Sequence, residues 1–188
     1  MILEIPKQAV VNRIIPKDRF NFDDATKIER IRWVGKLAPN TINLPAKKIQ
    51  EIEVFSVDMP EFDLNVIKEI VTKIPQEILF IVNGELGIMY YLDQFISKKV
   101  ENHLQIKGLS IDEVRDNFIR QLLDIGDISK PLKKQVDEIQ IINGLELEID
   151  RINTQIKRSI QTNKKQALAR ERYTIEQGVL VSMGRKYP

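Results

Sequence analysis

The chain has 188 residues, of which 43% are hydrophobic and 30% charged, as in soluble folded proteins and unlike disordered ones. Its net charge of +2 is too balanced to indicate a polyanionic partner from the total alone. There is no cysteine, which excludes disulfides and thiolate chemistry, and the sequence shows neither a signal-peptide core nor the roughly 20 apolar residues of a spanning helix. We therefore expect a soluble, cytoplasmic protein.

The first 40 residues predict short helical elements followed by one longer helix. Pro6 and Pro16 each open a turn or a short helix, because proline fixes φ near the helical value. Asp24 is suited to cap a helix that ends at Pro39. Its expected face comprises Ile28, Ile31, Val34 and Leu37 or Ala38. Trp33 lies next to this face, so we expect it to anchor the core rather than to stack on a ligand.

The middle of the chain predicts a β-α-β unit followed by a hairpin. Residues 52–57 form a strand, and the next helix, which Pro75 ends, has Leu64, Ile67, Ile70 or Val71 and Ile74 on one face. Residues 78–82 are apolar at every position, which is typical of a strand buried on both sides of a sheet. Asn83-Gly84 then predicts a type I′ turn into a returning strand over 88–92. The expected sheet is mixed, with helices covering both faces.

Residues 96–106 are ambiguous between a strand and irregular structure, and they belong to a segment, 91–106, to which we assign no role. Ser110 to Glu113 is a capping-box pattern that begins a helix. The face of this helix comprises Ile111, Val114, Phe118 and Leu122, and Gly126 is expected to close it.

Residues 132–173 predict one long helix that continues beyond the body of the protein. Apolar residues recur at steps of three or four, the seam of a coiled or packed helix. The expected interface residues are Val136, Ile139, Leu145, Ile149, Ile152 and Ile156. The predicted fold class is therefore α/β, a small mixed sheet with packed helices followed by a long coiled-coil-like helix. The expected division is a body over 1–128 and a helical arm with a short tail over 129–188.

The two halves of this predicted helix carry opposite charge. Residues 132–156 contain three basic and five acidic side chains, whereas 157–172 contain six basic side chains and one acidic one. Phosphate binding requires such a concentration of cations among amide and hydroxyl donors. The candidate nucleic-acid contacts are Lys157, Arg158, Lys164, Lys165, Arg170 and Arg172. The alternative is a solvated helix end whose cations only offset the helix dipole.

Conventional catalytic patterns are scarce. His103 is the only histidine, so no triad or typical metal-ligand set can be assembled around it, and we expect no cofactor and no metal. Asp58, Glu61 and Asp63 follow the first strand of the β-α-β unit and are weak candidates for a Mg²⁺ site of a nuclease-like enzyme. The favoured interpretation is structural, with Asp63 capping the next helix and the other two solvated.

Several short segments together resemble an uncharacterised prokaryotic family, domain of unknown function 4391. The resemblance runs from residue 5 to about residue 172 and departs from the family between Tyr91 and Leu104, while the tail, 178–188, matches nothing. It rests on Ile5-Pro6-Lys7, Ile15-Pro16-Lys17, Ile31-Arg32-Trp33, Lys36 to Leu44, Glu51 to Phe55, Ile78 to Phe80, Gly108-Leu109, Asn117-Phe118, Arg120 to Leu122 and Gln161 to Leu168.

The resemblance implies no established activity. Such genes tend to lie beside DNA methyltransferase and helicase genes in restriction or phage-defence clusters, which is association and not mechanism. We therefore expect a non-catalytic interaction subunit of a DNA-processing system, with a protein partner that is a second copy or a helicase- or methyltransferase-type enzyme. The alternatives are a divergent metal-dependent nuclease and a homodimeric scaffold without nucleic-acid contact.

Overall fold

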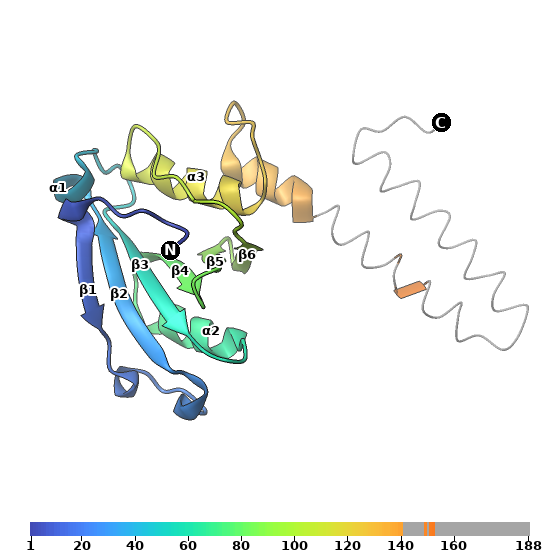
Figure 1. Ribbon diagram of the computed structural model, residues 1–188. Helices are drawn as coiled ribbons and strands as arrows, with labels where there is room; N and C mark the ends of the chain where they lie inside the picture. The colour runs from blue at the N-terminus through green and yellow to red at the C-terminus, as the bar shows by residue number, and fades with distance from the viewer. Residues whose placement is uncertain (141–148, 150, 153–188) are drawn as a thin grey trace, which may run out of the picture. The chain divides into compact units, whose positions relative to one another are not determined.

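The computed structural model describes residues 1–140, 149 and 151–152 (Figure 1). The chain forms two units, Met1–Asp127 and Ile128–Pro188. The first unit is built on a six-stranded sheet whose strands are arranged in chain order. They are β1 (Val10–Ile14), β2 (Arg30–Leu37), β3 (Ile52–Asp58), β4 (Glu77–Val82), β5 (Leu86–Tyr91) and β6 (Gln94–Lys99). Only the β3–β4 pair is parallel, so the predicted mixed α/β fold is confirmed for this unit.

Helices cover both faces of the sheet (Figure 1). The crossover helix α2 (Leu64–Lys73) packs its buried residues against Phe55, Phe80 and Ile88 on one face. On the other face, Leu122 at the end of α3 (Ile111–Leu122) lies against Gly87 of β5. Because side chains alternate along a strand, β4 supplies Phe80 to one layer and its neighbours Leu79 and Ile81 to the other. This explains why β4 is apolar throughout, as the sequence predicted.

The helix predicted over 25–38 is wrong, because β2 occupies most of that range. Asp24 does cap a helical turn, accepting from the amide of Thr26 at 3.0 Å, but this turn is the 3-10 helix η3 (Ala25–Lys27). A bulge between Trp33 and Gly35 inserts one extra residue into the strand. The buried positions therefore fall at Ile31, Val34 and Leu37, a spacing of three that imitates a helix. Pro39 likewise does not end a helix but begins α1 (Pro39–Ile42).

The two early prolines open short helices as expected. Pro6 precedes η1 (Lys7–Ala9) and Pro16 precedes η2 (Lys17–Arg19). In the hairpin after β4, Asn83 and Gly84 both have positive φ, as their sequence predicted, although the loop also includes Glu85. The Asn83 side chain exchanges hydrogen bonds of 2.8 and 2.7 Å with the backbone of Met59, which joins this hairpin to the loop after β3.

The ambiguous segment after β5 divides into two parts. Its beginning is β6, whereas 100–110 runs irregularly apart from a bridge between Leu3 and Leu104. Ser110 caps α3 as predicted, accepting from the amide of Glu113 at 3.1 Å, while the Glu113 carboxylate accepts from the amide of Leu109. Contrary to expectation, Gly126 does not close α3. Asp124 takes the left-handed conformation, with φ of 57°, directly after the helix.

In the second unit, residues 132–140 are helical, and so are 149, 151 and 152. Leu132 and Val136 are buried and Ile139 is half-buried, whereas Lys133, Lys134, Asp137 and Glu138 are exposed. The charged residues over 132–140 are therefore exposed and the predicted apolar positions are wholly or partly buried, together with the polar residue Gln135. The remainder of the long helix predicted over 132–173 lies outside the described residues.

Candidate functional site at a carboxyl pair in an aromatic cleft

A cleft of about 350 Å³ lies on the α2 side of the sheet. Its walls include the aromatic residues Phe20, Trp33 and Phe55, and its polar groups include Glu51, Glu53 and Arg19. A volume of this size is at the lower end of the range for small-molecule sites. All of its lining residues lie between positions 15 and 76, so η2, α2 and the strands β2 and β3 build it.

Glu53 occupies an inward position of β3. Glu53, Phe55 and Val57 alternate along the strand toward the layer that contains α2, and Glu53 stands opposite Lys36 of β2 and Ile78 of β4. The residue is only 5% exposed, and its Oε2 atom has no hydrogen-bond donor. A buried polar atom without a partner costs free energy, so such an atom requires a physical explanation.

The explanation is a proton held between Glu53 and Glu51. Burial raises the pKa of Glu53 to about 8, and the adjacent Glu51 carboxyl adds to this shift. The hydrogen bond from Glu53 lowers the pKa of Glu51, whose Oε2 also lies 3.1 Å from Lys36 Nζ. At neutral pH, Glu53 is therefore a carboxylic acid that donates to an ionised Glu51, and Lys36 balances that remaining charge.

Trp33 packs against the core, as predicted, and it also lines the cleft. The indole packs against the buried cluster of the α2 layer, and its N–H donates to the Gly35 carbonyl at 3.0 Å. Arg13 lies 5.7 Å from the centre of the ring. The sequence prediction missed this site because Trp33 was placed on a helix, whereas β2 sets it directly beside Phe55.

Two cations in the cleft lining have no counter-ion among the described residues. The side chains of Arg19 and Lys73 make no hydrogen bond or ion pair with the described residues, and both residues are exposed. Lys73 stands in the last turn of α2, where its charge also offsets the helix dipole. Arg19 ends the single 3-10 turn η2, so its charge does not offset the dipole of a longer helix.

The predicted carboxylate cluster does not converge. Asp63 caps α2 by accepting from the amide of Asn65 at 3.0 Å, and it lies 3.6 Å from Lys27 Nζ. Asp58 ends β3, and Glu61 is exposed in the following loop. Among the described residues, no three or more histidine, cysteine, aspartate or glutamate side chains are grouped so as to hold a metal ion. The capping role predicted for Asp63 is confirmed, and His103 is exposed.

The other predicted site residues fall in the second unit. Of the interface residues, Val136 and Ile152 are buried, and Ile139 and Ile149 are half-buried. Leu145 and Ile156 lie outside the described residues. The same holds for the six candidate nucleic-acid contacts, Lys157, Arg158, Lys164, Lys165, Arg170 and Arg172.

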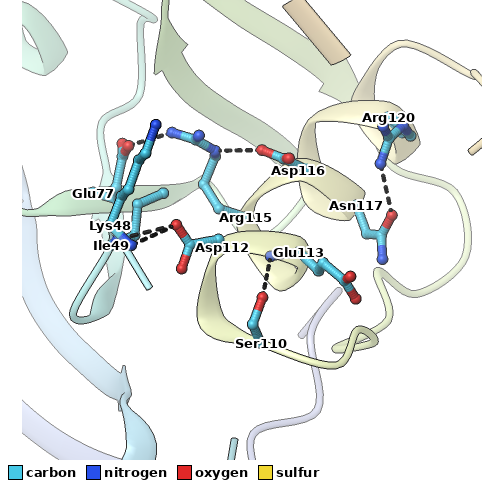
Figure 2. A network of polar contacts seen from close by, with 10 residues as sticks. All are labelled: Lys48, Ile49, Glu77, Ser110, Asp112, Glu113, Arg115, Asp116, Asn117 and Arg120. Carbon is cyan, nitrogen blue, oxygen red and sulfur yellow. Dashed lines mark hydrogen bonds and ion pairs between the residues drawn. The ribbon is translucent and has the colours of Figure 1, made fainter. Parts of the chain in front are cut away.

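A second polar network fixes the loop before β3 to α3 (Figure 2). Asp112 accepts three backbone amide hydrogen bonds, from Lys47 at 2.9 Å, Lys48 at 3.0 Å and Ile49 at 3.1 Å. Partial burial raises the pKa of Asp112, but these amides outweigh it and hold the pKa below its usual value. Arg115, one turn along, bonds Glu77 and Asp116 and covers the Tyr91 ring at 4.9 Å. Every group here has a partner, so the network is structural.

The fold and the cleft define the first unit as a mixed α/β domain without a conventional catalytic set among its described residues. Residues 3–94 match the family model described as Domain of unknown function (DUF4391). The matched range contains the whole cleft lining and ends at the first residue of β6. The resemblance predicted from the sequence is confirmed over this range.

The other comparisons give no relative. No curated protein matches the chain, and no solved structure matches it. Within the described part of the chain, no helix has both the length and the apolar character needed to span a membrane.

Proposed function

We propose that this protein is a non-catalytic interaction subunit of a bacterial DNA-processing system, of the restriction or phage-defence type, and that its C-terminal helix joins it to a second copy. The observation that carries the proposal is the separation of apolar from charged side chains over 132–140. Amphipathic helices with this spacing bury their apolar side against another helix. The family resemblance supplies the link to DNA processing, by association only.

The sequence that follows supports a second copy as the partner. The acidic and basic halves of the predicted helix are complementary when two copies run antiparallel, because each acidic half then faces a basic one. Exposed pairs of this kind contribute about 0.3–0.5 kcal/mol each. They would therefore select the orientation of the pair more than its affinity.

We further propose that any nucleic-acid contact runs through the late basic cluster, from Lys157 to Arg172, and is independent of base sequence. Five net positive charges in that stretch support phosphate contacts, while the acidic residues before it confine the footprint. The nuclease alternative has no supporting observation, because Asp58, Glu61 and Asp63 do not form a metal-binding group.

Salt dependence of DNA binding tests this proposal. If Arg158, Lys164, Lys165 and Arg170 each contact one phosphate, the logarithm of affinity for duplex DNA falls with the logarithm of salt at a slope of about 3.6. Changing all four to glutamine should abolish binding measured by fluorescence anisotropy. The matched control changes four exposed cations of the first unit to glutamine: Lys7, Lys48, Lys68 and Lys107.

That control variant should bind like the wild type. Full binding by the first variant, or no binding by the wild type at low salt, contradicts the nucleic-acid part of the proposal. The homodimeric scaffold is then the function that remains.

A further inference from the structure

The cleft beside β2 and β3 is not used by the proposed interaction function. It combines three kinds of group: aromatic rings from Phe20, Trp33 and Phe55, a carboxyl pair, and the cations Arg19 and Lys73. Each kind alone is common on protein surfaces. Their convergence in one cleft of about 350 Å³ restricts the ligands that fit it.

The burial of Glu53 is costly for the fold, because the hydrogen bond to Glu51 does not satisfy all of its polar atoms. Glu53 is 5% exposed, and its Oε2 atom has no donor from the described residues. Lys36 Nζ lies 3.1 Å from Glu51 Oε2 and balances its charge. While Glu53 holds its proton, the two carboxyl groups and Lys36 together carry no net charge. Both residues line the cleft, and Glu51 is the more exposed of the two, so the pair with Lys36 presents a hydrogen-bonding edge without net charge to a ligand and does not attract a free cation.

The cations have the opposite character. Arg19 and Lys73 are exposed and pair with no counter-ion in the described part of the chain, so they favour an anionic group in the outer part of the cleft. Since Lys73 also offsets the dipole of α2, Arg19 is the stronger contributor. With Lys36 included, three cations line the cleft against two carboxyl groups, which disfavours an amine as the ligand.

We propose that this cleft binds a nucleotide, with the base between the aromatic walls and against the Glu51–Glu53 pair, and with the phosphate at Arg19 and Lys73. A base offers a planar ring for stacking and an edge of N–H and carbonyl groups for the carboxyl pair. Its phosphate supplies the negative counter-charge for Arg19 and Lys73. The same chemistry occurs in a free nucleotide and at the phosphorylated end of a single strand.

Trp33 provides a local readout because it is the only tryptophan of the chain. Its fluorescence in the full-length protein should change on titration with AMP, GMP, CMP or UMP, and at least one should bind in the micromolar to millimolar range. Adenosine or guanosine, which lack the phosphate, and ribose 5-phosphate, which lacks the base, should each bind at least about tenfold more weakly. A 5′-phosphorylated tetranucleotide that binds tighter than the mononucleotide assigns the strand end, and equal or weaker binding assigns the free nucleotide.

Three variants and one control locate the contacts. Arg19→Gln should weaken nucleotide binding about tenfold or more and Lys73→Gln less, whereas Lys68→Gln, an exposed position of α2 outside the cleft lining, should leave it unchanged. Wild-type binding of AMP should weaken between pH 7 and 9 as Glu53 ionises, and the charged groups that line the cleft with it are Glu51, Lys36, Arg19 and Lys73. Glu53→Gln, whose fold is checked by circular dichroism, should remove this pH dependence.

Three results would overturn the proposal. The first is no fluorescence change with any of the four nucleotides at millimolar concentration. The second is binding that Arg19→Gln and Lys73→Gln leave intact. The third is binding of spermidine or arginine amide in preference to every nucleotide, which identifies a cation site. None of these results bears on the C-terminal helix, so they are separate from failure of the proposed function.

Discussion

Glu53 lines the candidate site, and its burial lowers the stability of the fold at high pH. Its pKa is raised to about 8 from 4.5, so the folded state retains a proton that the unfolded chain releases above pH 4.5. The stability that protonated Glu53 contributes is complete below pH 4.5 and is lost as pH rises through about 8. Ionisable groups kept in such environments are enriched at functional sites.

We therefore predict that Glu53→Gln stabilises the protein in a pH-dependent way. Glutamine keeps a neutral donor to Glu51 and has no proton to lose. Its free energy of unfolding should be close to that of the wild type at pH 5 and about 2–4 kcal/mol higher at pH 8.5, since each unit of pKa shift corresponds to about 1.4 kcal/mol. Urea denaturation at the two pH values measures this. Glu101→Gln, at an exposed carboxylate, is the control, and a constant difference between Glu53→Gln and wild type contradicts the account.

The sequence contains a local signal for the unusual environment of Glu53. An acidic residue that alternates with Phe55 and Val57 in a buried strand is an exception to the rule that inward positions are apolar. The aromatic partner was hidden because the bulge at Trp33 gives β2 the spacing of a helix. Glu51 and Glu53 are only two residues apart in the chain, whereas their placement beside Lys36 and Trp33 of β2 depends on strand register, which a single sequence does not specify when a bulge intervenes.

Elements with strong local signals were predicted well. Asp63 and Ser110 cap their helices as expected, and β3, α2 and β4 form the predicted parallel unit. These depend on capping, proline placement and long apolar runs, all of which are local properties. The Asp112 network was not predicted, because its acceptor and its amides are more than 60 residues apart in the chain.

At the level of elements, we predict that Asp112 fastens the loop before β3 to α3. Asp112→Ala leaves three backbone amides without their acceptor and should lower the free energy of unfolding by about 1–3 kcal/mol. Hydrogen exchange at Lys47, Lys48 and Ile49 should accelerate in the variant, while exchange in β4 follows only the global change. The control is Glu101→Ala, and unchanged exchange at the three amides would show that the loop is held by other contacts.

At the scale of the whole molecule, two units carry separate roles in this account. The first contains the cleft and the segment that matches the family model, and the second contains the helix that we propose for association. The expected boundary between residues 128 and 129 lies beside the division after Asp127. All lining residues of the cleft lie between positions 15 and 76, so none of them belongs to the C-terminal helix. Variants in one unit should therefore leave the function of the other unchanged.

Charge predicts that two copies pair with their helices antiparallel. Because the chain has no cysteine, single introduced cysteines report the orientation by disulfide crosslinking. Cysteines placed at both 146 and 164 should crosslink two copies through a 146–164 disulfide, since an acidic half then lies beside a basic half. A variant with cysteine only at position 146 should crosslink poorly. Efficient crosslinking of position 146 to itself would establish a parallel pair.

Sedimentation velocity of the full-length protein tests the central claim, that the C-terminal helix is an association element, most directly. The wild type should sediment with twice the mass of one chain at micromolar concentration. Ile139→Asp, which places a charge on the apolar side of the helix, should sediment as a single chain, whereas Gln140→Asp adds the same charge at an exposed position and should behave as the wild type. A wild type that remains a single chain at all concentrations, or an Ile139→Asp variant that still pairs, would contradict the claim.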